Sequence, residues 1–440
     1  KIERARLKNG IKVVFARQTA VPVVRLLLST PGGIPADDRK KPGTQTMMLG
    51  LLGEGTDGRL GPMDGPAIAR LEERLGAGIN ASVSLDRSRY SLNALTPTLA
   101  QSIRLFADIL LHPTFPEDQL ERVRVQAKTA LARANSTPNG LAMRVLPALL
   151  YGPDHPYGFS FSGNGTEAGL QGVTRADLIS YHRQQMTPER AEIFVVGDTN
   201  MATLLPLLEQ AFGNWQGTAP AAAPADSAPV PPVTPARGRI AFLDRPGAEQ
   251  SLIVAAAADR LTGRDDTLAV ALANDVFGGL TSARLNAELR EAKNWSYGAY
   301  SSLSPTRLAM PFLITAPVET PATGDSIAAI RRLLADFEGP NPPTPAEIEN
   351  ARANLIRSLP GDFETGSALV SALERQANLE RPDDYLETLP ARLAAVDEKE
   401  VAAAPLPKVD DLVWVVVGDR ETVLPQLQAL GLPIDEMPLP

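Results

Sequence analysis

A strand-turn-helix pattern that occurs twice in the chain decides the fold. Residues 191–213 read AEIFVVGDTNMATLLPLLEQAFG, and residues 412–431 read LVWVVVGDRETVLPQLQALG. Each stretch has an apolar run typical of a strand, then V-V-G-D, then a helical pattern that carries T-x-L-P and closes near a glycine. Because the order of these features is shared, we predict that the chain contains two copies of one domain plan rather than a chance resemblance.

The composition changes sharply between the two copies. Residues 217–237 read GTAPAAAPADSAPVPPVTPAR, in which alanine and proline dominate and large apolar residues are scarce. Such a stretch is typical of a semi-extended linker. We therefore predict an N-terminal domain over residues 1–216 and a homologous C-terminal domain over residues 238–440.

Each predicted domain opens with strand-like segments and continues with helical ones. The strand-like segments are residues 11–15, 21–29, 239–243 and 251–257. Ile327, Ile330, Leu334 and Phe337 repeat at helical spacing. Strands followed by helices and a returning strand predict an α+β fold, in which each domain is a mostly antiparallel sheet with helices packed on one face.

Composition excludes several classes of function. The chain of 440 residues has a net charge of -8, which argues against a nucleic-acid partner, and no apolar run reaches the roughly 18 residues needed for a membrane span. It has no cysteine and only three histidines, so disulfides, thiolate catalysis and cysteine-ligated zinc are excluded.

The chain begins at Lys1 rather than Met, and we expect that a preceding segment, such as a signal peptide, was removed. We therefore expect a periplasmic protein, with the cytoplasm as the alternative.

The stretch richest in chemistry is FGGLTSARLNAELREAKNWSYGAY, residues 277–300. Arg290 is expected to close a short helix, and Tyr297 lies seven residues on, where a strand is expected to begin. A guanidinium and a phenol at such a junction could hold a peptide carbonyl. Spacing alone favours a simpler interpretation, in which Arg290 is a solvated helix-end cation and Tyr297 is an ordinary sheet residue.

This stretch resembles the second-domain signature of the pitrilysin/insulinase (inverzincin) family of zinc metallopeptidases, G-G-x-x-S-x-R-L-x-x-E-(L/I)-R-E-x-x-x-x-x-Y. The matching residues are Gly278, Gly279, Ser282, Arg284, Leu285, Glu288, Leu289, Arg290, Glu291 and Tyr297. The resemblance implies that Arg290 and Tyr297 hydrogen-bond the substrate backbone. It also implies that the two domains form half of a clamshell around a peptide-sized chamber.

The first-domain signature of that family is missing. Catalytic members carry H-x-x-E-H, in which two histidines bind zinc and the glutamate is the general base. Here Thr46 and Gly50 stand at the histidine positions and Leu49 at the base position. The glutamate that completes such a site is expected near residues 129–130, where Thr and Ala stand. We therefore expect neither a metal ion nor a catalytic residue in this chain.

No other catalytic site is indicated by the sequence. His112, His155 and His182 are best interpreted as structural residues, and Glu54 as a surface carboxylate. The chain shows no nucleophile elbow, phosphate loop or dinucleotide-binding fingerprint.

The resemblance and the missing motif together predict a non-catalytic, substrate-binding subunit of a heteromeric peptidase. A homologous subunit with H-x-x-E-H would supply the zinc in a 1:1 heterodimer, and unstructured peptides would be the substrates. Residues 77–83 resemble the strand that pairs with substrate in catalytic subunits. The alternatives are a structural scaffold, as in respiratory-complex subunits of the family, and a peptide-recognising subunit like the noncatalytic half of the mitochondrial processing enzyme.

Overall fold

The computed structural model describes residues 2–217, 232–404 and 406–439 and divides them into two compact units. Unit 1 comprises residues 2–132, 162–217 and 360–378, and the remaining described residues form unit 2. Neither unit is one continuous piece of chain. Most of the predicted linker, residues 218–231, lies outside the described residues, so the predicted domain boundaries at 216 and 238 stay a prediction.

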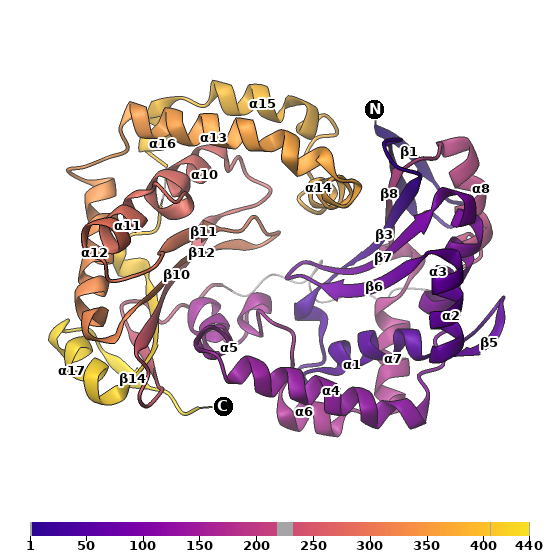
Figure 1. Ribbon diagram of the computed structural model, residues 1–440, viewed down its shortest axis with the longest axis horizontal. Coiled ribbons are helices and arrows are strands. Elements are labelled where there is room, and N and C mark those ends of the chain that lie inside the picture. The colour runs from indigo at the N-terminus through magenta and orange to yellow at the C-terminus, as the bar shows by residue number, and fades with distance from the viewer. Residues whose placement is uncertain (1, 218–231, 405, 440) are drawn as a thin grey trace. The chain divides into compact units, whose positions relative to one another are not determined.

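Unit 1 contains a six-stranded sheet and a small hairpin (Figure 1). The strands of the sheet, in spatial order, are β1 (Ile2–Arg6), β2 (Lys12–Arg17), β8 (Glu192–Gly197), β3 (Val23–Pro31), β7 (Arg87–Leu95) and β6 (Gly78–Val83). All neighbours in this order are antiparallel except β2 and β8, which are parallel. The hairpin joins β4 (Gly55–Gly58) to β5 (Gly61–Asp64).

Unit 2 repeats this arrangement except at one edge, where its outer strand is parallel to its neighbour, whereas β1 is antiparallel to β2. Its strands, in spatial order, are β11 (Tyr300–Leu303), β12 (Ala309–Glu319), β10 (Gln250–Thr262), β13 (Val413–Gly418), β9 (Ile240–Asp244) and β14 (Ile434–Glu436). β13 lies parallel to β9 and antiparallel to β10, as β8 lies parallel to β2 and antiparallel to β3. The two V-V-G-D runs thus end the same central strand of two equivalent sheets, and the predicted α+β class with two similar sheet domains is confirmed.

The helices fall into two matching sets. In unit 1 they are α1 (Thr44–Leu51), α2 (Gly65–Leu75), α3 (Leu99–Leu111), most of α4 (Glu117–Asn135), α6 (Glu167–Gly172), α7 (Arg175–Gln185), α8 (Met201–Phe212) and α14 (Gly366–Asn378). In unit 2 they are α5 (Pro138–Tyr151), α10 (Leu268–Asn274), α11 (Arg284–Asn286), α12 (Thr323–Glu338), most of α13 (Pro345–Glu364), α15 (Tyr385–Ala395), α16 (Glu398–Ala402) and α17 (Arg420–Ala429). None of the described helices is both long and apolar enough to cross a lipid bilayer.

Alternate residues of the central strands of unit 1 face two different layers. Val24, Leu26 and Leu28 of β3 belong to the main core, which they share with residues of α1, α3, α7 and α8. Ser29 of β3 and Phe194 of β8 are also buried, although they are not part of that core. A strand whose side chains are buried on both faces needs a second covering layer.

Helix α14 supplies that second layer in unit 1. It follows α13 in the C-terminal part of the sequence, yet it packs on β3 and β8. Helix α5 follows α4 at the corresponding place in the N-terminal part and packs on β10 and β13 of unit 2. Each half of the sequence therefore provides the helix that covers the second face of the other half's sheet.

A buried carboxylate fixes α14 on its sheet. Glu374 is fully buried and accepts hydrogen bonds from Nε and Nη2 of Arg89 at 2.9 and 2.5 Å, and from the Ser29 hydroxyl at 2.9 Å. Arg87 donates to the same Ser29 hydroxyl at 2.9 Å and pairs with Glu192 at 2.7 Å. Burial by itself would lower the pKa of Arg89, but the hydrogen bonds and charge of Glu374 raise that pKa above its ordinary value.

Glu374→Ala is expected to lower the free energy of unfolding by about 3 kcal/mol, because it leaves Arg89 and the Ser29 hydroxyl without their buried acceptor. Urea denaturation followed by circular dichroism measures the change. Glu167→Ala is the matched control, since Glu167 is exposed and, among the described residues, its carboxylate pairs with Lys128 alone, at 3.3 Å. We expect the control to change stability by less than about 1 kcal/mol. Equal stability of the two variants would contradict a structural role for the Glu374 network.

Candidate functional site

At the start of the segment that carries Arg290 and Tyr297, the backbone at Gly278 lies very close to β11. Helix α10 continues into a π-helical turn over Asp275–Gly279. A Cβ atom on Gly278 would lie 2.5 Å from the Ser301 hydroxyl and 2.8 Å from the Ser301 backbone nitrogen. Glycine is therefore required here to let the turn pack against β11.

The helix that follows is held in place by its buried side. Leu285 and Leu289 are fully buried. Arg284 forms a bidentate pair with Glu347 at 2.7 and 2.6 Å. These hydrogen bonds are the main cause that lowers the pKa of Glu347 to about 2, so the pair stays ionised into the acid range. Gly278, Arg284, Leu285 and Leu289 of the signature thus position the segment rather than face solvent.

Arg290 and Tyr297 differ from these residues because both are exposed. Arg290 lies in a second π-helical turn, Ala287–Ala292, and its Nε approaches the carboxylate of Glu291 at 3.3 Å. Tyr297 is 87% exposed. It precedes β11, which begins at Tyr300, three residues later than the sequence led us to expect.

The loop around Tyr297 is anchored on both sides by buried polar side chains. The Ser296 hydroxyl bonds to the Pro317 carbonyl at 2.5 Å and accepts from the Gly298 nitrogen at 3.1 Å. Asn286, which is fully buried, accepts from the Ala299 nitrogen at 3.2 Å. The exposed phenol therefore stands on a backbone with little freedom. The sequence analysis missed Asn286 and Ser296, although a polar residue between the apolar positions 285 and 289 was a usable signal.

The positions of the missing zinc motif lie on α1 in unit 1. The Thr46 hydroxyl donates to the Gly163 carbonyl at 2.6 Å. Leu49 packs against the core. A Cβ atom on Gly50 would lie 2.9 Å from Cγ1 of Val123 on α4. Thr46 and Gly50 thus offer no imidazole, Leu49 offers no base, and an imidazole at position 50 would need Val123 to move, so these residues do not fit a zinc ion.

Helix α4 presents a different residue to this site than the sequence suggested. Thr129 and Ala130 are exposed, and the Thr129 hydroxyl bonds back to Val125 of its own helix at 2.8 Å. Val123 is the residue of α4 that approaches Gly50. Within the described part of the chain, no three His, Asp or Glu side chains are grouped so that they could hold a metal ion.

A pocket of about 340 Å³ lies beside this degenerate site. It is lined by Leu49, by Glu54 and Glu72, and by residues 79–81 of β6. Glu54 pairs with Arg122 at 2.6 Å. Burial raises the pKa of Glu72, although a hydrogen bond from the Ile79 nitrogen opposes the shift. The pocket thus has acidic and apolar walls.

Strand β6 forms one wall of this pocket and one edge of the sheet. Among the described strands it pairs only with β7, so the backbone groups along its other side have no strand partner. It covers Gly78–Val83, nearly the same residues as the predicted segment 77–83. An edge of this kind can accept an extended peptide.

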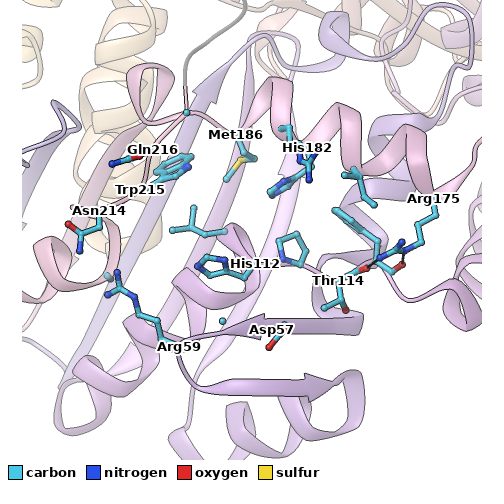
Figure 2. A pocket seen from close by; sticks show the side chains of 18 residues that line it. Asp57, Arg59, His112, Thr114, Arg175, His182, Met186, Asn214, Trp215 and Gln216 are labelled. Carbon is cyan, nitrogen blue, oxygen red and sulfur yellow. Dashed lines mark hydrogen bonds between the residues drawn. The ribbon is translucent and has the colours of Figure 1, made fainter.

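None of the three histidines lines the pocket beside α1 or belongs to the signature segment. His155 is buried, stacks on Tyr151 with ring centroids 4.8 Å apart, and accepts from the Tyr157 nitrogen at 3.1 Å. His112 and His182 line a separate pocket in unit 1 (Figure 2).

Comparison with known proteins identifies two family matches along the chain. The model described as Insulinase (Peptidase family M16) matches residues 12–155, and the model described as Peptidase M16 inactive domain matches residues 172–355. The second of these matches includes the signature segment with Arg290.

Individual relatives agree with these matches. An uncharacterized zinc protease of Mycobacterium leprae is 25% identical over 377 residues, which are 84% of this chain and 81% of that protein. A probable mitochondrial-processing peptidase subunit beta of Schizosaccharomyces pombe is 24% identical over 50% of this chain and 46% of its own length. The crystal structure of a peptidase M16 inactive domain from Pseudomonas fluorescens is similar with a TM-score of 0.85 and 26% identity, over 95% of this chain and 98% of that one.

These matches cover both halves of the chain in the same order as its two sheets, and they agree with the signature of residues 278–297. The chain belongs to the insulinase family, peptidase family M16.

Proposed function

We propose that this chain is the non-catalytic, substrate-binding subunit of a heteromeric zinc metallopeptidase that degrades peptides. A homologous partner with H-x-x-E-H would supply the zinc, which polarises the scissile carbonyl and activates water. The substrates would be unstructured peptides. The arrangement would be a 1:1 heterodimer in the periplasm, with the cytoplasm as the alternative compartment.

The contact between Gly50 and Val123 carries this proposal. Loss of motif residues alone could be compensated by neighbouring ligands if the space for them remained. Here a Cβ atom at position 50 would lie 2.9 Å from Cγ1 of Val123, and position 123 carries no carboxylate that could act as a further ligand. The motif positions therefore lack metal ligands and one of them is obstructed, which favours a subunit that leaves hydrolysis to another chain.

Arg290 and Tyr297 are the residues that would bind the substrate backbone. Arg290 offers several N–H donors and Tyr297 one O–H donor, and both side chains are exposed on an anchored segment. Donors that are fixed before substrate arrives need little reorganisation when a peptide carbonyl binds. In the complex they would orient the substrate backbone beside the bond that the partner cleaves.

A heteromeric arrangement also has support among the relatives. The Schizosaccharomyces pombe relative is named as a subunit of a processing peptidase, so at least one similar protein is described as part of a larger enzyme. A purely structural scaffold is the alternative. Asn286 and Ser296 are buried and anchor the loop that carries Tyr297, whose side chain is 87% exposed. This arrangement favours a binding role over a scaffold role.

The chain purified alone is expected to contain no stoichiometric zinc and to leave quenched fluorescent peptides uncleaved. Addition of the homologous H-x-x-E-H subunit, sought in the neighbouring reading frame or by co-purification, is expected to give cleavage that a chelator abolishes. Metal analysis and peptide hydrolysis with each chain alone and mixed make the test. Chelator-sensitive hydrolysis by this chain alone would rule out the proposed division of labour.

Tyr297→Phe is expected to lower kcat of the complex by about 10²-fold while its zinc content stays unchanged, because the change removes one preorganised donor. Arg290→Gln is expected to have a similar effect. Tyr300→Phe is the matched control, since Tyr300 is a second exposed tyrosine only three residues away, and it should retain full activity. If Tyr297→Phe and Tyr300→Phe behave alike, Tyr297 does not contact substrate.

Restoring the motif by Thr46→His, Leu49→Glu and Gly50→His is not expected to produce stoichiometric zinc binding, because Val123 blocks position 50 and no third ligand is present. Adding Val123→Glu to the triple variant removes the obstructing branch and supplies a carboxylate, so zinc binding should then appear. Inductively coupled plasma mass spectrometry after dialysis measures the bound metal. Full zinc occupancy in the triple variant alone would show that Val123 does not seal the site.

A further inference from the structure

A second pocket of unit 1, of about 840 Å³, is lined by residues that the proposed function does not use (Figure 2). None of its lining residues is shared with the pocket beside α1. Its volume is within the usual range for small-molecule sites, roughly 300 to 1,000 Å³. Its walls come from β4 and the turn after it, the segment that follows α3, one face of α7, Ala211 at the end of α8, and residues 214–217 after that helix.

The pocket is basic in an acidic protein. Arg59, Arg175 and Arg183 line it, and Asp57 is the one acidic residue in the lining. With the histidines neutral, three arginines and one aspartate give a local charge of +2, whereas the whole chain has a net charge of -8. Figure 2 shows Arg59 and Arg175 toward opposite ends of the pocket. A local excess of cations raises the concentration of anionic ligands there.

The three arginines differ in how many of their N–H donors already form hydrogen bonds. Arg175 donates to the carbonyls of Phe115 and Thr114, each at 2.8 Å, and Arg59 donates to the Gln210 carbonyl. Arg183 is exposed and has no ion pair or side-chain hydrogen bond with the described residues. Because a guanidinium has five N–H donors, all three retain donors for a ligand.

The rest of the lining is apolar. Ile179 and Met186 lie on the same face of the α7 region as His182 and Arg183, at helical spacing, and Trp215 lines the pocket after α8. The pocket thus has cationic groups beside an aromatic and aliphatic surface. This combination suits a ligand that has an anionic group on an apolar body.

His182 adds a directional acceptor. Its Nε2 lies 2.7 Å from the Leu110 carbonyl, which can only accept, so Nε2 carries the proton. Burial lowers the pKa of His182 and keeps the ring neutral, although the hydrogen bond to Leu110 opposes this shift. The Nδ1 atom then carries a lone pair for a ligand N–H or O–H group.

The backbone at Phe115 is held in an unfavourable conformation in this pocket wall. Phe115 has φ 45°, in the left-handed region that bulky residues rarely adopt. The Arg175 donation to its carbonyl and an edge-to-face contact with His182, with centroids 5.7 Å apart, hold it there. Such strain gathers at binding sites, where the surrounding structure maintains it.

We propose that this pocket binds a ligand that combines one carboxylate or phosphate group with an aromatic or aliphatic body. The free donors of Arg183 and Arg59 bind the anion, and Trp215, Met186 and Ile179 contact the body. The ligand is either a free organic acid or the carboxyl terminus of a peptide, since both present the same chemistry.

Isothermal titration calorimetry of the full chain tests the proposal with matched probes. The probes are N-acetyl-phenylalanine, N-acetyl-phenylalaninamide, phenyl phosphate, and a pentapeptide that ends in phenylalanine. The acid or the phosphate is expected to bind at least tenfold more tightly than the uncharged amide. Tighter binding of the pentapeptide than of N-acetyl-phenylalanine identifies a peptide terminus as the ligand, and the reverse identifies a free acid.

Substitutions test whether the probes bind in this pocket. Arg59→Gln with Arg183→Gln is expected to weaken binding of the acid at least tenfold, whereas Arg70→Gln, an exposed arginine on α2 outside the pocket, leaves it unchanged. Trp215→Phe is a second readout, because it removes the ligand-dependent change in tryptophan fluorescence. Equal affinity for acid and amide, equal effects of the pocket and control variants, or no binding of any anionic probe at millimolar concentration would overturn the proposal.

Discussion

The main constraint on this fold is that the central strand of each sheet is buried on both faces. In β8, Ile193 and Val195 face the main core of unit 1, while Phe194 and Val196 are equally buried on the other side. The helices of the same half of the sequence form one covering layer, and the other face has to be covered by another element. Helices α14 and α5 meet this need reciprocally. Because the face under α14 carries Arg87, Arg89 and Ser29, the covering helix must also bring a carboxylate, and Glu374 provides it.

The sequence predicts the parts of the fold that depend on local patterns. The apolar runs before V-V-G-D predict strands, and these are β8 and β13 at equivalent places in the two sheets. Thr344 and Glu347 form the hydrogen bonds of a helix start, which the Thr-Pro-x-Glu pattern encodes within four residues. The exchange of α5 and α14 was not predicted, because their own sequences show only an amphipathic helix and not which sheet it covers. That choice depends on partners hundreds of residues away, such as Arg89 for Glu374.

The same limit applies to the candidate sites. Thr46, Leu49 and Gly50 could be identified from the sequence because the motif spans five consecutive positions. The residue of α4 that faces them could not be identified from the sequence, because a small difference in chain length between α1 and α4 changes which residue of α4 lies beside α1. The structure places Val123 there, and residues 129–130 point to solvent. Likewise, Asn286 and Ser296 gain their roles only when β11 and β12 are in place, because their partners are backbone groups of that region.

The motif helix of unit 1 and the signature segment of unit 2 differ in how their side chains are placed. In unit 1, the motif helix has become part of the core: Leu49 packs on it, Val123 fills the space beside Gly50, and the remaining carboxylates Glu54 and Glu72 are paired or hydrogen-bonded. In unit 2, the buried polar residues of the signature segment hold Tyr297 away from the core. Exposing most of an aromatic ring forgoes on the order of 2 kcal/mol of hydrophobic stabilisation, and fixing the loop beneath it uses two buried polar side chains. The exposure of this ring on an anchored loop therefore supports the proposed contact between Tyr297 and a peptide substrate.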